Sequence, residues 1–148
     1  MDQTLYRLLS WTWGLPLTLA GAIVSAVLRL LGHRPRKWGW TTCFVVGKNW
    51  GGLSLGPVTL ASSPSEDLLR HEFGHSVQNC RLGPFYLPVI LLPSALRYWY
   101  RRWAVRAGKG RSLSPYRSIW FEAQADRLGQ KYAGRFPAPP QGKGPHSL

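Results

Sequence analysis

The first long apolar segment of the chain runs from Leu8 to Leu28 and contains no charged residue. A helix of this length spans about 30 Å, which matches the hydrocarbon core of a bilayer. Trp11 and Trp13 lie near its start, and a cationic stretch at 29–37 follows its end, as in a membrane helix whose C-terminal end is cytoplasmic. The pattern predicts an uncleaved single-pass membrane helix, with the remaining chain in the cytoplasm.

Two other interpretations of residues 8–28 stay open. Ala20-Gly21-Ala22 resembles the cleavage site of a signal peptide, although the leader before it has no net charge and the apolar run continues beyond it. Pro16 and several Thr and Ser residues lower the hydropathy of the segment, which is compatible with an amphipathic helix or a buried core helix.

Residues with high β-propensity are concentrated at 40–46 and, more weakly, at 53–60. The Gly-rich segment 47–52 between them has the composition of a turn. We therefore expect a β-hairpin made of these two strands, preceded by a basic Gly/Pro linker at 32–39.

A helix start follows the expected hairpin at Ser63-Pro64-Ser65-Glu66. Ser63 can act as the N-cap, Pro64 suits the first helical position, and Glu66 completes a capping box. We expect this helix to end near residues 80–81, because Gly83-Pro84 stops it.

The second apolar segment, 85–100, is interrupted by two prolines and followed by arginines. It is short for a membrane crossing, so a re-entrant or interfacial segment is predicted, and a buried loop over an active site is equally compatible. A last helix is expected to begin with Ser114 as its N-cap and Pro115 at its first position, and to end near Gly134. Residues 135–148 have the Pro/Gly-rich composition of a disordered tail.

The composition narrows the class of protein. The chain has 148 residues and a formal net charge of +13, from 19 Lys and Arg against 6 Asp and Glu. Apolar residues make up 45% of it, which excludes a disordered basic tail, and two cysteines are too few for a disulfide-rich scaffold. The charge favours an anionic partner. Because the cations flank the two apolar segments and no nucleic-acid recognition motif is present, we expect an anionic membrane surface and no nucleic acid.

The candidate chemistry is concentrated in His71-Glu72-Phe73-Gly74-His75, an HExxH motif within the predicted helix. Histidines four residues apart lie on one helix face, where both imidazoles can bind one Zn²⁺. Glu72 then lies beside the open position of the metal and can accept a proton from water. The motif predicts His71 and His75 as zinc ligands and Glu72 as the catalytic base.

A catalytic zinc site needs a third protein ligand. A metzincin would carry a third His at position 81, which is Arg81 here. Cys80 is better explained as a small buried residue, and His33 and His146 lie in segments without a supporting motif. These residues are not expected to bind the metal.

The remaining candidate ligand is Glu122, one helical turn before Asp126. Two unpaired carboxylates on one helix face repel each other unless a cation lies nearby. We therefore expect Glu122 to bind the metal and Asp126 to accept the N–H of a zinc-bound histidine. A solvated helix face, in which Asp126 pairs with Gln130 or an Arg, is the other interpretation.

HExxH followed by ExxxD is the pattern of gluzincin metallopeptidases. The fuller form Glu-x-x-Ala-Asp-Arg at 122–127 resembles the membrane-embedded CAAX-processing and heat-shock peptidases of that clan. The chain is also similar to small bacterial proteins that carry HExGH, then Leu-Gly-Pro-x-Tyr-Leu as at 82–87, then Pro-Ser as at 93–94. The resemblance implies the same zinc-binding and catalytic roles as the motifs, and a strand 53–60 whose free edge pairs with an extended peptide.

This chain also departs from the membrane peptidases that it resembles. It is about half as long, and it has one convincing apolar span instead of several. The residue that would stabilise the tetrahedral oxyanion is not assigned by a motif, and Tyr116 and Tyr132 are the candidates.

The fold expected from these observations is α+β: a minimal zincin-like domain of a short β-hairpin, an active-site helix and a ligand helix, with an N-terminal membrane helix. The expected division is an anchor at 1–31, a metallopeptidase domain at 32–134 and a tail at 135–148. The expected function is a membrane-associated zinc metallopeptidase that hydrolyses a peptide or protein substrate with metal-activated water. The alternative is a catalytically silent gluzincin-like protein that binds zinc and mediates interactions at a membrane, but a structural zinc site does not need the base Glu72.

Overall fold

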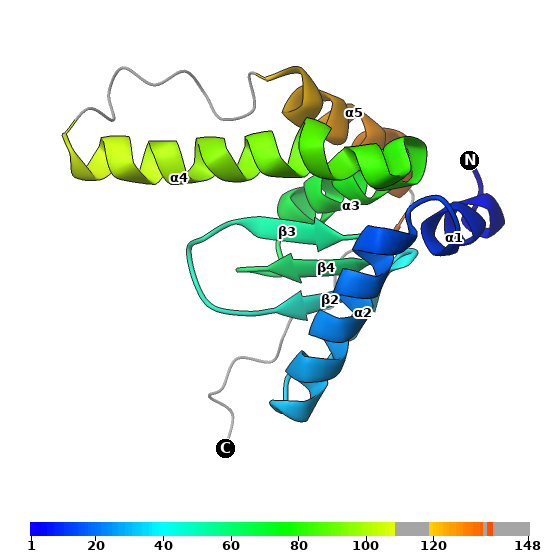
Figure 1. The fold of residues 1–148 in the computed structure, drawn as a ribbon. Helices are drawn as coiled ribbons and strands as arrows, with labels where there is room; N and C mark the ends of the chain where they lie inside the picture. The colour runs from blue at the N-terminus through cyan, green and yellow to red at the C-terminus, as the bar shows by residue number, and fades with distance from the viewer. Residues whose placement is uncertain (109–118, 135, 138–148) are drawn as a thin grey trace.

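The computed structural model describes residues 1–108, 119–134 and 136–137, and its mixed helices and strands confirm the predicted α+β class (Figure 1). The N-terminal half contains two helices and four strands: α1 (Gln3–Trp11), α2 (Leu15–Leu30), β1 (Arg36–Trp38), β2 (Thr41–Val45), β3 (Gly52–Leu55) and β4 (Val58–Ala61). Three helices follow: α3 (Glu66–Leu82), α4 (Leu92–Arg106) and α5 (Trp120–Ala133). A 3₁₀ turn at Gly83–Phe85 and a π-helical turn at Leu87–Leu91 join α3 to α4.

The four strands form one mixed sheet in the order β1-β2-β4-β3. The predicted hairpin between 40–46 and 53–60 is wrong, because the second segment is itself a hairpin: β3 and β4 pair antiparallel around a turn at Gly56, whose φ is +59°. The loop 46–51 carries the chain past β4, so that β2 pairs with β4 in parallel, with Thr42 opposite Val58. Strand β1 occupies part of the predicted linker, and β3 forms one edge of the sheet.

The predicted continuous helix over Leu8–Leu28 is also wrong. The chain bends by 91° between α1 and α2, with Gly14 just before the first turn of α2 and Pro16 inside it. A side chain at Gly14 would collide with Asn79 of α3, whose amide nitrogen lies 2.6 Å from an ideal Cβ position there. Among the described residues, no single helix has the length and hydropathy of a membrane span, and only the bent pair α1–α2 meets both criteria jointly.

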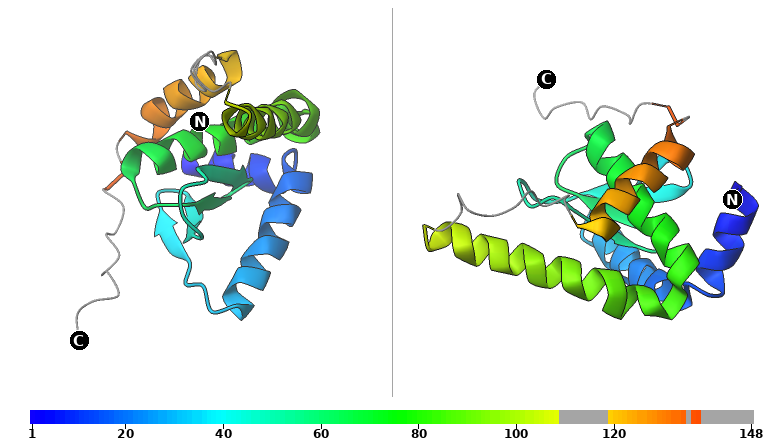
Figure 2. Two further views of the ribbon diagram at one scale, coloured as in Figure 1. Left: turned by 90° about the vertical axis from the view of Figure 1, so that its left-hand side faces the viewer. Right: turned by 90° about the horizontal axis from the view of Figure 1, so that it is seen from above.

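Helix α3 is the centre of the fold, with the sheet on one side and α5 on the other (Figure 2). Its N-cap is Ser65, which accepts a hydrogen bond from the backbone N–H of Leu68, so the predicted cap at Ser63 is two residues too early. It ends at Leu82, where Gly83 has a φ of +55° that a side chain disfavours, as predicted from the Gly-Pro pair. Most of α3 after its first turn is buried, including both histidines of the motif.

The segment 85–100 is helical rather than a loop, because its prolines lie in the first turns of the π-helical segment and of α4, where a missing N–H costs little. Helix α5 begins at Trp120 with Ile119 as its N-cap, and Gly134 is its C-cap. The residues predicted to begin this helix, Ser114 and Pro115, lie outside the described residues. So do Tyr116, His146 and nearly all of the predicted tail.

Candidate metal centre

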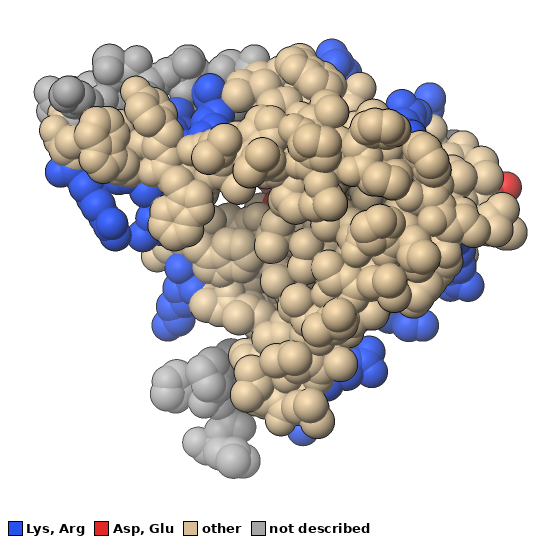
Figure 3. Space-filling view, viewed as in Figure 1, with Lys and Arg blue, Asp and Glu red and all other residues tan. Residues whose placement is uncertain are grey.

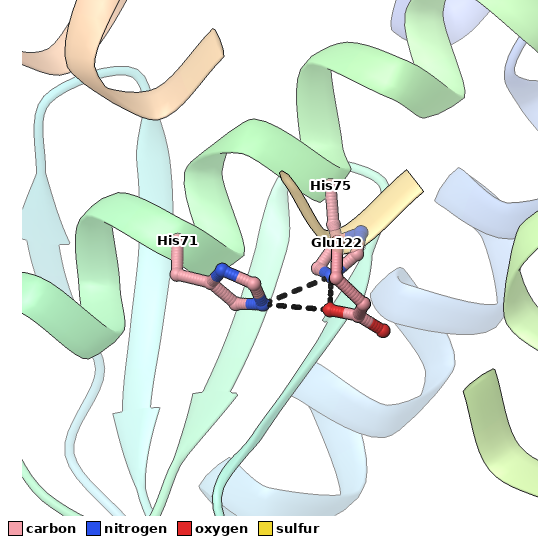
Figure 4. Close-up of side chains that lie close together, drawn as sticks. All are labelled: His71, His75 and Glu122. Atoms are coloured by element: carbon pink, nitrogen blue, oxygen red, sulfur yellow. Dashed lines mark hydrogen bonds and ion pairs between the residues drawn. The ribbon is translucent and has the colours of Figure 1, made fainter. Parts of the chain in front are cut away.

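The two histidines of α3 point their Nε2 atoms at each other. These atoms are 3.1 Å apart, and both side chains are buried (Figure 4). The four-residue spacing places the rings on the same side of the helix, one turn apart. In this geometry a single ion between the rings could be reached by both.

Glu122 of α5 completes the cluster. Its Oε2 lies 3.1 Å from Nε2 of His71 and 3.2 Å from Nε2 of His75, and its side chain is buried (Figure 4). Helices α3 and α5 approach closely enough for this because glycines lie at their crossing: a Cβ on Gly74 would come within 1.9 Å of the carbonyl oxygen of Ala125. Gly129 of α5 makes the same kind of contact with the backbone of α3.

The outer ring nitrogens have partners of their own, which fixes the tautomer of both rings. Nδ1 of His71 lies 2.7 Å from Oδ1 of Asp126, and Nδ1 of His75 lies 2.8 Å from Oε1 of Gln78. The amide of Gln78 cannot be turned round, because its Nε2 donates to the carbonyl oxygen of Phe121 at 2.8 Å. Both Nδ1 atoms therefore carry the proton and donate, which leaves a lone pair on each Nε2.

Nε2 of His71, Nε2 of His75 and Oε2 of Glu122 thus converge, and their spacing can be compared with that of the ligands of a metal ion. Two imidazole lone pairs and a carboxylate oxygen, 3.1–3.2 Å apart, repel one another unless a proton or a cation lies among them. A tetrahedral Zn²⁺ with bonds of about 2.0–2.1 Å separates its ligand atoms by about 3.3 Å. The cluster of His71, His75 and Glu122 could therefore hold a metal ion, and the donor set fits zinc.

The electrostatics of the cluster follow from its contacts. Burial alone would raise the pKa of Glu122, but in the metal-free cluster the hydrogen bonds that His71 and His75 donate when Nε2 carries a proton, together with a hydrogen bond from Ser94, outweigh burial and hold that pKa well below its usual range. Burial would lower the pKa of His71, but the neighbouring carboxylates of Glu122, Glu72 and Asp126 raise it. The carboxylate of Glu122 is therefore ionised at neutral pH, as a metal ligand must be.

Glu72 lies beside the cluster without belonging to it. Its side chain is buried, and burial raises the pKa of its carboxyl group against the opposing effect of the two histidines. The hydroxyl of Ser54 in β3 donates to this carboxylate at 2.8 Å and also lies 2.6 Å from the backbone oxygen of Glu72. Gly52 leaves room for the carboxylate, because a Cβ there would lie 2.5 Å from Oε1 of Glu72.

The cluster and Glu72 form the floor of a pocket of about 570 Å³ between β3, α3 and α4. The hollow is visible near the centre of the face shown in Figure 3. Three arginines of α4 line the pocket, Arg101, Arg102 and Arg106, and its walls are mainly apolar, with contributions from Trp50, Leu53, Leu68, Leu91 and Val105.

Other residues considered from the sequence lie elsewhere. The thiol of Cys80 is buried 3.3 Å from the hydroxyl of Ser10 in α1, burial raises its pKa, and it does not belong to the group of three converging ligand atoms. Tyr132 packs against the hydrophobic core and does not line the described pocket. His33 is exposed between α2 and β1.

Three site residues were not found from the sequence: Gln78, Ser54 and Ser94. Gln78 could have been noticed, because it lies three residues after His75 and therefore on the same face of a helix that is mostly buried. Ser54 comes from β3, and nothing in its local sequence distinguishes it from a surface serine. Ser94 of α4 belongs to the Pro-Ser pair noted in the sequence, but that resemblance gave it no role at the site.

No family model, curated protein or solved structure matches this chain. The interpretation of the site therefore depends on its geometry and on the chemistry of its donor atoms.

Proposed function

We propose that this protein is a zinc-dependent metallopeptidase with a zincin-like site, and that Glu72 is its general base. The observation that carries the proposal is the position of a buried carboxylate, held by Ser54, beside three converging ligand atoms on the floor of an open pocket. A site that served only to stabilise the fold would use four protein ligands and no adjacent base.

Zinc is the metal that we propose for the cluster, because two histidines and one glutamate are a common donor set of catalytic zinc. When bound, zinc supplies Lewis acidity: it lowers the pKa of water to near neutrality and polarises a carbonyl group. Asp126 and Gln78 keep both rings in the tautomer that presents Nε2 to the ion. Ser94 holds the second oxygen of Glu122, which fixes the orientation of that carboxylate.

Glu72 supplies the proton transfers. Burial makes its carboxylate a stronger proton acceptor than an exposed glutamate, so it can take the proton of the attacking water. The same carboxyl group can then give that proton to the departing amine of the cleaved bond. Ser54 donates to Oε2, and Oε1 is directed toward Gly52 at the sheet edge.

The sheet edge beside Glu72 supports a peptide as the substrate. Among the described strands, β3 has a neighbour on one side only, and its residues Gly52, Leu53 and Ser54 line the pocket. An edge strand can pair with an extended peptide through backbone hydrogen bonds, which would lay a scissile bond along the pocket floor. The apolar walls would accept hydrophobic side chains of that peptide. As expected from the sequence, we propose that the protein is associated with a membrane and that its catalytic domain is in the cytoplasm.

The test is a matched pair of isosteric variants, Glu122→Gln and Glu72→Gln, purified beside the wild type and analysed for metal content. We expect one zinc per chain in the wild type, loss of zinc in Glu122→Gln, and full zinc in Glu72→Gln with no cleavage of a peptide library that the wild type cleaves. Zinc in the wild type and in Glu72→Gln, its loss from Glu122→Gln, and no cleavage by any of the three would support the catalytically silent alternative. A wild type that takes up no zinc at neutral pH would refute the metal centre itself.

A further inference from the structure

Helix α2 has its polar and apolar faces reversed for a helix of a water-soluble domain. The residues that face the protein are mostly small or polar, with Thr18, Gly21 and Ser25 all buried. The residues that face outward are apolar and recur at helical spacing, and the most exposed of them are Ile23 at 65% and Leu30 at 88%. A surface helix in water shows the opposite arrangement.

Helix α4 carries a second exposed apolar stripe. Leu92, Leu96, Trp99 and Trp103 follow one another at intervals of three or four residues and are all exposed, Trp99 by 66%. By helical spacing, Ser94 and Arg101 lie on the opposite side of α4, whereas Arg102 and Arg106, which also line the metal pocket, lie beside the stripe. The aromatic and aliphatic stripe therefore leaves a row of large apolar side chains exposed along α4.

The two stripes belong to one side of the molecule. Both turned views place α2 and α4 on the side that faces the viewer of Figure 1 (Figure 2). On that side most of the visible surface is uncharged, and Lys and Arg lie mainly around its border (Figure 3). Neither helix contains Asp or Glu, whereas α2 contributes Arg29 and α4 contributes Arg97, Arg101, Arg102 and Arg106.

We propose that this face, made by the outward stripes of α2 and α4, docks in the plane of an anionic lipid bilayer without crossing it. An exposed apolar surface that contains Trp and is bordered by cations, with no acidic residue on either helix, fits the interface between anionic headgroups and acyl chains. The arginine side chains can extend toward phosphate groups while their aliphatic parts lie on the apolar surface. This arrangement replaces the membrane crossing expected from the sequence at residues 8–28.

Docking of this face places the metal pocket at the membrane. The pocket lies between β3 and α4, on the side of α4 next to the docking stripe, and its hollow opens on the same side of the molecule (Figure 3). If the proposed peptidase activity holds, which this step requires, the bond that reaches Glu72 belongs to a segment lying at the lipid surface. Docking itself requires only α2 and α4.

The experiment is flotation of the purified full chain with vesicles of phosphatidylcholine, with and without about a third of phosphatidylglycerol. Trp103→Ser tests the stripe of α4, and Trp120→Ser on α5 is its matched control, because both side chains are 58% exposed. The double variant Ile23→Ser/Val27→Ser tests α2. We expect strong binding of the wild type to anionic vesicles, weakened by salt, a loss of about 10-fold or more in the partition coefficient for Trp103→Ser and for the double variant, and a change of less than about twofold for Trp120→Ser.

Three outcomes would overturn the proposal: no vesicle binding by the wild type, an equal loss for Trp103→Ser and Trp120→Ser, or a lipid-independent dimer that Trp103→Ser converts to monomer without any vesicle binding. Circular dichroism of each variant establishes that it is folded before it is compared. Vesicle binding is also measured for Glu122→Gln, in which we expect the partition coefficient to be unchanged. Failure of the metal centre is thereby distinguished from failure of the docking face.

Discussion

At the crossing of α3 and α5, helix propensity and packing have opposite effects on the free energy of unfolding when Gly74 is replaced by Ala. Gly74 lies in the interior of α3, where replacing Gly by Ala normally stabilises a helix by about 1 kcal/mol. In this structure an added Cβ at Gly74 would lie 1.9 Å from the carbonyl oxygen of Ala125 and 2.5 Å from its carbon atom, both backbone atoms of α5. Neither helix can relieve such a contact by rotating a side chain.

The size of the effect follows from that distance. Real Cβ contacts of this kind almost never fall below 3.0 Å, so the two helices must separate by about 1 Å or more. Overpacking of this kind costs about 1–3 kcal/mol, which exceeds the propensity gain. The same displacement moves Glu122, which lies on α5 one turn before Ala125, and a metal site tolerates errors of only about 0.2 Å in its bond lengths. We therefore expect Gly74→Ala to lower the free energy of unfolding by up to about 2 kcal/mol and to lose most of the bound metal.

Urea unfolding of protein freed of metal by a chelator gives the free energy of unfolding. The metal content of untreated protein after dialysis gives the amount of bound metal. Because the clash is with the backbone of Ala125, the double variant Gly74→Ala/Ala125→Gly should show no recovery of metal. A Gly74→Ala protein that is more stable than the wild type and keeps one metal per chain would show that helix propensity outweighs the crossing, and would refute this account of the site.

Two further predictions concern single side chains. Asp126→Asn weakens the hydrogen bond at Nδ1 of His71, now 2.7 Å long, and should lower metal affinity by about 10-fold in a chelator competition; an unchanged affinity would contradict its role in orienting that ring. Burial raises the pKa of Cys43 from its ordinary value of 9.0 to about 11, so the folded state favours the neutral thiol. The stabilisation is therefore complete below pH 9 and is lost as the pH rises from 9 toward 11. Over that range the free energy of unfolding, measured in urea, should fall by about 2 kcal/mol more for the wild type than for Cys43→Ala. Parallel curves of the two proteins would show that the buried thiol does not titrate in this way.

Local sequence information was enough to predict the helix that carries the histidines. The four-residue spacing of His71 and His75 and the stop at Gly83-Pro84 depend on neighbours within one or two turns, where helix geometry is regular. The pairing of the strands was not predictable in this way. Residues 47–51 of the expected turn at 47–52 lie outside the strands, and Gly52 already begins β3. The strands on either side, β2 and β3, are separated in the sheet by β4, and the order of strands is decided by contacts distant in sequence.

The supporting residues of the site show the same limit. The pair Glu122 and Asp126 could be noticed because two carboxylates one helical turn apart are unfavourable without a cation. Ser54 has no comparable signal, and the Pro-Ser pair that contains Ser94 assigned it no role, because each serine becomes important only when β3 and α4 are packed beside α3. The bend at Gly14 likewise depends on Asn79, a residue far along the chain that fills the space a side chain would need.

The chain order of the elements has a consequence for how the protein is assembled during synthesis. A ribosome releases the chain from its N-terminus, so α2 and α4 emerge before α5. The two histidines are then present without Glu122, which follows His75 by 47 residues, and the space between their rings has no carboxylate facing it. The two helices of the proposed docking face are thus synthesised before the last of the three candidate metal ligands.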